Sequence, residues 1–462
     1  MRGVFTVPAG TSFVDAIAAT VIDQFGGPPE RLADVLILVP TRRAIRSLSE
    51  AFLRQSGGRS LIQPDVRALG DVDEDELTVA VTGNHLADTA VPPAITPLRR
   101  QLILANRIRS NTQFGVANDE QATQLAAALA SFIDEVETAE ADFTKLSTLV
   151  SEERLSEHWQ ITLRFLTTLT EGWKQQLGNE GRVDPAVRRR LLLDRLGAIW
   201  ADTPPQGPVI AAGSTGTIPA TARLLARVAK LPQGMVVLPG LDQVMDSDAW
   251  ERIDDSHPQH ALRALLETLE TSRDQVELWP IGDDKDFSCG NPSRHSLMSQ
   301  ALLPADAEVR LTDLTVDPRA LDGLHIAPCG NPREEAQVAS LRMRLELEEP
   351  GRTVALVTRD RDLARRVAAD LKRWSIDVDD SAGEPLGTTP AGTFLRLVAQ
   401  AAHHRWAPIP LLALLKHPFL RLRREAAEVR SLARRLEISA LRGPRPATGL
   451  RGLRSTLSEN SG

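Results

Sequence analysis

Residues 35–52 read VLILVPTRRAIRSLSEAF, an apolar run followed by a turn and then by a segment with helical periodicity. An apolar run as short as Val35 to Val39 is typical of a strand that is buried on both faces. Apolar residues then recur from Ile45 to Phe52 at the three- and four-residue spacing of one helical face. Further short apolar runs, each followed by a turn residue, lie at 4–7, 209–212, 235–238 and 354–357. This alternation predicts an α/β protein with parallel strands.

A long stretch between two of these units is predicted to be purely helical. From residue 95 to residue 200, apolar side chains such as Leu125 and Ile133 fall on one helical face, and no strand candidate interrupts them. We therefore expect a first α/β domain that is formed by 1–94 together with 201–322. The stretch at 95–200 is then an all-helical insertion into that domain.

A second domain is expected beyond a break in the pattern. Gly, Asp, Pro and Ser cluster at 281–322 around short segments of uncertain type. A new α/β unit is predicted to begin with a strand at 324–327, which places a second domain at 323–462. That domain looks unfinished, because only about two strand candidates precede an Arg- and Leu-rich tail.

Length and composition indicate a globular protein of more than one domain. The 462 residues are 42% hydrophobic and 25% charged, which is ordinary for soluble proteins. No apolar run approaches the ~18 residues of a membrane span, and the start lacks the pattern of a signal peptide. Cys289 and Cys329 are too few for a disulfide framework or a four-thiolate metal site. We expect a cytoplasmic protein with no membrane partner.

The net charge of −7 is unevenly distributed. Residues 401–462 carry twelve Lys/Arg against four Asp/Glu, a balance of +8, whereas the other 400 residues carry 42 against 57, a balance of −15. A basic segment on an acidic body can mark a nucleic-acid contact. A solvated helix face explains the same bias and is the more common reason for it.

The loop Pro8-Ala9-Gly10-Thr11-Ser12 stands where a P-loop enzyme carries its phosphate cradle, between the first strand and the first helix. A working cradle needs a lysine for the β- and γ-phosphates and a Ser or Thr for magnesium. No Gly-Lys-Ser or Gly-Lys-Thr occurs anywhere in the chain. Gly10, Thr11 and Ser12 are therefore predicted to form a degenerate phosphate loop, in which a hydroxyl caps the helix.

Thr41, Arg42, Arg43 and Arg46 follow a predicted buried strand and begin a predicted helix. Arginines in this position project from the carboxyl edge of a parallel sheet, where α/β proteins bind ligands. They are candidates for contacts with DNA phosphates, which position DNA without reading its sequence. The alternative is that they are solvated charges in a first helical turn, where the helix dipole disfavours positive charge.

Three other motifs imitate functional sites. Phe132-Ile133-Asp134-Glu135 resembles a Walker B strand, but its helical surroundings predict a solvated helix face for both acids. Gly213 to Thr217 is predicted to be a tight turn with a hydroxyl cap rather than a hydrolase elbow. The acidic run from Asp71 to Glu76 lacks the spacing of a calcium loop. No nuclease motif is found.

The order of several longer motifs carries a resemblance to a known family. They include Leu38-Val39-Pro40-Thr41-Arg42-Arg43, Pro332-Arg333-Glu334-Glu335-Ala336 and Leu414-Leu415-Lys416-His417-Pro418, with further matches at 1–40, 70–77, 97–101, 158–160, 210–216, 237–242, 356–358 and 379–383. Together they resemble the AddB family, of the alphaproteobacterial type, over essentially the whole chain. AddB is the second subunit of the AddAB helicase–nuclease, which processes double-strand breaks.

This resemblance implies a fold and a set of partners. The fold is a degenerate superfamily 1 helicase, whose first RecA-like domain is interrupted by the helical insertion and whose second begins near 323. Thr41 to Arg43 falls where related helicases place a motif that contacts single-stranded DNA. The implied partners are the AddA motor subunit and single-stranded or duplex-end DNA, and ATP-driven movement would belong to AddA.

The sequence also departs from that family. Family members continue into a nuclease domain with magnesium and with an iron–sulfur cluster held by four cysteines, and no residue here matches either site. We therefore expect no cofactor in this chain and a truncated second domain. Two alternatives stay open, namely a divergent P-loop nucleotide hydrolase that uses the 8–12 loop, and an inactive fragment of AddB.

Overall fold

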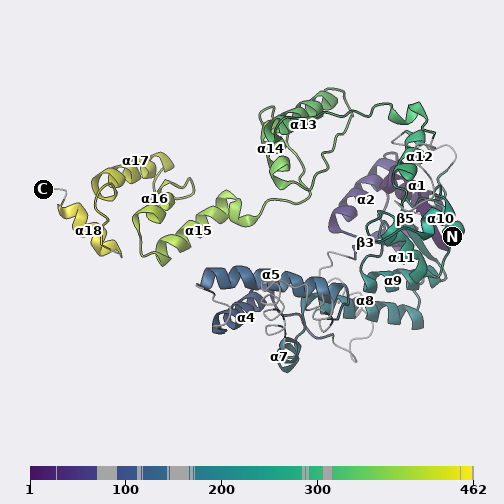
Figure 1. Ribbon diagram of the computed structural model, residues 1–462, viewed down its shortest axis with the longest axis horizontal. Coiled ribbons are helices and arrows are strands. Elements are labelled where there is room, and N and C mark those ends of the chain that lie inside the picture. Colours follow the sequence, from purple (N-terminus) through teal and green to yellow (C-terminus); the bar gives the residue numbers. More distant parts are fainter. Residues whose placement is uncertain are drawn as a thin grey trace, which may run out of the picture. The chain divides into compact units, whose positions relative to one another are not determined.

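The computed structural model describes residues 1–27, 29–69, 91–111, 116, 118–142, 145, 166, 170, 172–282, 287, 291–304, 315–447 and 449–459. The chain forms two compact units, Met1–His325 and Ile326–Gly462 (Figure 1). Among the described residues, no helix combines the length and the apolar character that crossing a membrane requires.

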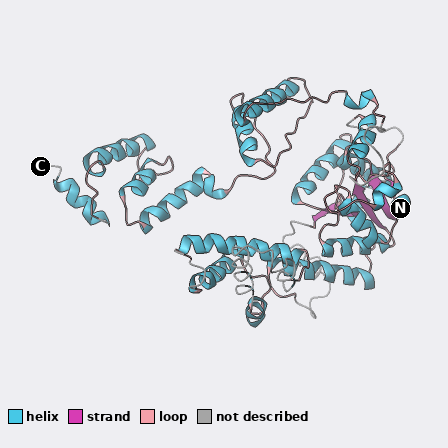
Figure 2. Ribbon diagram, viewed as in Figure 1, coloured by secondary structure: helices cyan, strands magenta, loops and turns pink. Residues whose placement is uncertain are grey.

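The amino-terminal unit is built on a six-stranded parallel sheet, so the α/β prediction is confirmed (Figure 2). The strand order is β3-β2-β4-β5-β1-β6, which places the first strand inside the sheet. The strands are β1 Gly3–Val7, β2 Leu36–Val39, β3 Asp65–Ala68, β4 Val209–Ala212, β5 Gly234–Pro239 and β6 Glu277–Leu278.

Helices cover both faces of this sheet, and successive strand residues alternate between the two cores. In β5, Met235 and Val237 join a core with α1 (Phe13–Phe25) and α2 (Arg42–Gln55). Val236 and Leu238 join the opposite core with the helices α8 (Pro185–Asp202), α9 (Pro219–Lys230) and α11 (His260–Leu269). This double burial explains why the central strands are uninterrupted apolar runs.

The predicted helical segment contains helices with a core of their own. Buried side chains of α4 (Pro97–Ser110), α5 (Asp119–Thr138) and α7 (Trp173–Asn179) form one cluster. In contrast, Leu192, Leu193, Leu196 and Trp200 of α8 join the core of the sheet. The last helix of the segment thus belongs to the α/β layers.

A buried ion network joins the helices of this segment. Arg100 on α4 lies 2.8 Å from Asp134 on α5 and 3.0 Å from Asp184, the residue that precedes α8. Trp173 on α7 donates its indole N–H to Asp184 at 2.9 Å. Asp134 and Glu135 lie on a helix, as predicted, and Glu135 is exposed. The side chain of Asp134 is 41% exposed and also pairs with the buried Arg100, which the sequence did not indicate.

The remaining short elements of the first unit connect and close the layers. They are the 3-10 helices η1 Pro29–Asp34, η5 Arg273–Gln275 and η7 Pro318–Leu321, and the helices α10 Ser247–Glu251 and α12 Pro292–Ala301.

The carboxyl-terminal unit is helical in the part that the structure describes. Its elements are α13 Pro332–Leu347, α14 Arg361–Lys372, η8 Leu386–Thr388, α15 Pro390–His403, α16 Pro408–Lys416, α17 Ala426–Leu436, the π-helix η9 Glu437–Leu441 and α18 Gly449–Glu459. The strands predicted at 324–327 and 354–357 are wrong, because neither segment pairs with a neighbouring strand. Without a sheet beside them, Ile326 and Val357 are 89% and 94% exposed.

Candidate functional site at the carboxyl edge of the sheet

The loops that follow β1, β2, β4 and β5 meet at one edge of the sheet, because parallel strands all end on the same side. The amide of Gly213, after β4, donates to the carbonyl of Val237 at 2.9 Å, and the amide of Gly240, after β5, donates to Val7 at 2.9 Å. A Cβ added to Gly213 would lie 3.2 Å from the ring of Phe13 and 3.9 Å from Pro40. The start of α1 and the residue after β2 thus lie close to Gly213.

The strand order places a topological switch point between β2 and β4. The chain leaves β2 through α2 toward β3, whereas it leaves β4 through α9 toward β5 on the opposite face of the sheet. Neighbouring strands whose following helices diverge in this way leave room outside their carboxyl ends, where α/β proteins bind ligands. Thr41 to Arg43 and Gly213 to Gly216 border this position.

In the loop predicted to be a degenerate phosphate loop, two backbone amides that could bind a phosphate already have partners within the chain. The amide of Ser12 donates to the carbonyl of Phe287 at 2.8 Å, and the amide of Thr11 donates to Pro8 at 3.3 Å. Ser12 is the residue before α1, as predicted, but its hydroxyl does not cap the helix and instead donates to Asp15 at 2.6 Å. Gly10 turns the chain with a φ of +79°.

Asp15 places a negative charge in the first turn of α1, where a bound phosphate would repel it. Arg54 lies 2.9 Å from this carboxylate, and Gln55 donates to it at 3.1 Å. Burial raises the pKa of Asp15, but hydrogen bonds from Ser12, Gln55 and Arg54 outweigh that effect and lower the pKa below its usual value. The carboxylate is therefore charged at neutral pH and does not favour polyphosphate binding.

Replacing Asp15 by asparagine is expected to destabilise α1 by about 1 kcal/mol at pH 7, because charge-assisted hydrogen bonds are lost. A group whose pKa is lowered by folding stabilises the folded state at pH values above its unfolded-state pKa. This stabilisation disappears as the pH falls through the folded-state pKa. The difference between Asp15→Asn and the unmodified chain should therefore shrink below about pH 4. Hydrogen exchange of α1 amides, measured at pH 7 and at decreasing pH below 4, tests this, and a difference that does not shrink as the pH falls would contradict it.

The arginine-bearing turn begins α2 with a side-chain cap. The hydroxyl of Thr41 accepts a hydrogen bond from the amide of Ala44 at 3.1 Å. Arg42 and Arg43 are exposed, and no acidic residue lies in this first turn. Arg46 pairs with Glu50 at 3.3 Å in an exposed i,i+4 pair, which is worth little and exchanges readily with an external anion.

The segment Gly213 to Thr217, after β4, forms a turn, as predicted. Gly213 and Gly216 have φ values of +80° and +66°, and the hydroxyl of Ser214 accepts from the amide of Gly216 at 3.3 Å. The hydroxyl therefore stabilises the turn rather than the helix, because Ile218 is the residue that precedes α9. The acidic run 71–76 lies outside the described residues.

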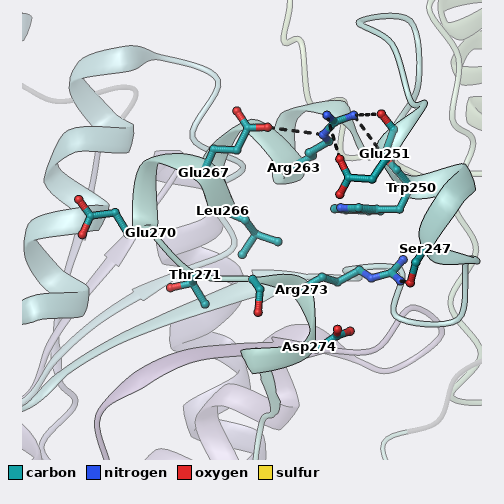
Figure 3. A pocket seen from close by; sticks show the side chains of 11 residues that line it. Ser247, Trp250, Glu251, Arg263, Leu266, Glu267, Glu270, Thr271, Arg273 and Asp274 are labelled. Atoms are coloured by element: carbon teal, nitrogen blue, oxygen red, sulfur yellow. Dashed lines mark hydrogen bonds and ion pairs between the residues drawn. The ribbon is translucent and has the colours of Figure 1, made fainter.

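Sequence reasoning missed a cavity of about 390 Å³ between α10, α11 and η5 (Figure 3). Arg273 stacks on the ring of Trp250 at 5.0 Å and donates to the carbonyl of Met245 at 2.8 Å. Arg263 donates to carbonyl oxygens of Trp250, Glu251 and Ile253. Both guanidinium groups thus hold neighbouring segments together. The cavity lies near the start of β6, at the amino edge of the sheet, and therefore apart from the carboxyl edge.

The sequence carried no local signal for the contacts Ser12–Phe287, Asp15–Arg54 or Arg263 with α10, because each joins residues that are distant along the chain or uses backbone groups. Neither a scan against protein-family models nor a search of curated proteins returned a match to this chain.

Proposed function

We propose that this chain is a non-catalytic, helicase-like protein of the AddB kind, which handles single-stranded DNA in double-strand-break repair and docks on an AddA motor subunit. The observation that carries the proposal is the exposed arginine turn Thr41–Arg43, which lies at the topological switch point at the carboxyl edge of a parallel sheet. A helix amino terminus offers backbone N–H groups to an anion, and arginine side chains add positive charge.

The parallel sheet supports the helicase-like part of the proposal. Its first strand is interior, so the loop that follows β1 lies centrally at the edge that a RecA-like domain uses for ligands. That loop lacks a lysine and places Asp15 where phosphates would lie. These features favour a domain that holds DNA over one that hydrolyses a nucleotide.

Replacing Arg42 and Arg43 together by alanine is expected to weaken binding of a single-stranded oligonucleotide about tenfold or more. Each lost phosphate contact reduces the magnitude of the slope of log K against log salt by about 0.7. The slope of the double variant should therefore be shallower by up to about 1.4. Fluorescence anisotropy with a labelled oligonucleotide, between 50 and 200 mM salt, measures both quantities.

A matched control removes two arginines at the opposite end of the strands. Arg31 and Arg59 are exposed and stand before β2 and before β3, at the amino edge of the sheet. Because Arg31→Ala/Arg59→Ala changes the net charge equally, only the position of the charge differs. Equal losses in the two double variants would contradict a site at the carboxyl edge, and absence of binding by a folded chain would remove the proposal.

A further inference from the structure

Three aromatic rings gather in the carboxyl-terminal unit. Phe394 on α15 lies 5.3 Å from the ring of His417 and 6.3 Å from the ring of Phe419, and the latter two rings lie 5.5 Å apart. Phe394 and His417 are half-buried, whereas Phe419 is 52% exposed. We call Phe394, His417 and Phe419 the ring cluster.

The backbone holds the ring cluster in a defined turn after α16. The amide of Phe419 donates to Nδ1 of His417 at 3.2 Å, and the amide of Leu420 donates to the carbonyl of His417 at 3.1 Å. The half-buried ring of Phe394 supports the exposed one from the neighbouring helix α15. An exposed aromatic ring fixed in this way needs little further ordering when a flat group stacks on it.

Three arginines follow the ring cluster directly. Arg424 pairs with Glu428, but no ion pair joins Arg421 or Arg423 to an acid in the part of the chain that the structure describes. Arg423 and its neighbour Leu422 also have φ values of +60° and +49°. Non-glycine residues in this left-handed region store strain, which is found preferentially at functional sites.

The ion pairs near the ring cluster leave a net positive charge on the segment that carries Arg421 and Arg423. Glu437 is neutralised by Lys416, at 2.6 Å, and by Arg442, at 3.1 Å, so it does not compensate the charge of that segment. Glu425, directly after these arginines, carries no ion pair in the described structure, and its single carboxylate does not balance the charges of Arg421 and Arg423. Exposed aromatic rings next to unpaired arginines are the combination that binds single-stranded nucleic acids, with bases on the rings and phosphates on the cations.

We propose that the ring cluster and Arg421 and Arg423 form a stacking site for single-stranded DNA. Phe419 stacks on a base, and the two guanidinium groups bind the adjacent phosphates. Because every base presents a π-face, the site tolerates any sequence, and because duplex bases are already stacked, it prefers single strands. The choice of ligand class rests on the proposed function, but the residues are different and lie in the other unit.

The test uses the full chain and three variants. Phe419→Leu keeps an apolar side chain but removes the π-face, so we expect its affinity for a labelled oligothymidine to fall on the order of tenfold, with an unchanged salt slope. Phe419→Trp should bind at least as tightly as the unmodified chain. Arg421→Ala/Arg423→Ala should weaken binding and lower the salt slope by up to about 1.4.

A base-free oligonucleotide of the same length separates stacking from charge. The unmodified chain should bind it more weakly than oligothymidine, and Phe419→Leu should bind it as well as the unmodified chain does. Ile409→Ala is the matched control, since Ile409 is an exposed apolar residue of the same unit without an aromatic ring.

Two results would overturn the stacking site. One is a Phe419→Leu variant that binds oligothymidine as tightly as the unmodified chain, and the other is equal affinity for the base-free strand. Loss of binding in Arg42→Ala/Arg43→Ala alone would support the carboxyl-edge site and reject this one. Loss of binding in Phe419→Leu alone would support the stacking site and reject the carboxyl-edge site.

Discussion

Replacing Arg100 by methionine is expected to lower the stability of the α4–α5–α8 region by about 3–5 kcal/mol, the usual cost of removing one partner of a buried ion pair. The side chain of Arg100 is 4% exposed, and it also donates to the carbonyl of Ala130 at 3.1 Å. Its removal leaves the carboxylate of Asp184, which is 2% exposed, without a cation.

The contact between Arg100 and Asp184 is an ion pair without an aligned hydrogen bond. Nε of Arg100 and Oδ1 of Asp184 are 3.0 Å apart, yet neither atom has a hydrogen-bond partner among the described residues. Burial raises the pKa of Asp184 and outweighs the opposing attraction of Arg100 and the hydrogen bond from Trp173. The arginine therefore lessens the cost of a buried carboxylate rather than cancelling it.

The effect of Arg100→Met should depend on pH in a defined direction. A group with a raised folded-state pKa adds stability below its unfolded-state pKa, and that contribution disappears as pH rises through the folded-state value. Loss of Arg100 raises the pKa of Asp184 further, so the variant should be least stable at neutral pH and recover partly toward pH 4. Hydrogen exchange of α4 and α5 amides, referenced to α13 in the other unit, measures this.

The matched comparison is Asp184→Asn. Asparagine keeps an acceptor for the indole of Trp173, removes the buried charge and leaves Arg100 paired with Asp134. We expect a loss of about 1 kcal/mol, well below that of Arg100→Met. Equal losses in the two variants, or an Arg100→Met loss that does not change with pH, would contradict this account.

The central strands could be predicted from the sequence because both their faces are buried. The runs at Val35–Val39 and 209–212 contain no polar residue, and the structure places β2 and β4 within them. The edge strands were missed for the corresponding reason. β3 reads DVRA and β6 is a two-residue exposed strand, so neither carries the apolar pattern.

The strands predicted wrongly at 324–327 and 354–357 show that an apolar run is not sufficient to predict a strand. An apolar run indicates that a segment suits a sheet, but a strand also needs a partner for its backbone groups. The described residues of that unit supply none. In the same way, the sequence places Thr41 at a helix start but cannot reveal that Asp15 pairs with Arg54, since that contact depends on how α1 packs on α2.

Replacing Phe52 by alanine is expected to destabilise α2 and the sheet face beneath it by about 3–5 kcal/mol, the range measured for buried phenylalanines. Phe52 is fully buried in the core that α1 and α2 form with β1, β2, β4 and β5. It is the largest buried side chain of α2, and it anchors the helix whose first turn carries Arg42 and Arg43. Faster hydrogen exchange in α2 and β2 measures the loss.

Leu53 provides the control, since it is the next residue of the same helix and is 63% exposed. Leu53→Ala should change stability by less than about 0.5 kcal/mol, and a loss as large as that of Phe52→Ala would show that burial is not the cause. The Phe52 variant also separates positioning from contact. If Arg42 and Arg43 bind phosphates, loosening α2 should weaken single-stranded DNA binding while the salt slope stays unchanged, because both cations remain. A lowered slope would instead mean that Phe52→Ala removes the contacts themselves, which requires α2 to unfold when DNA is bound.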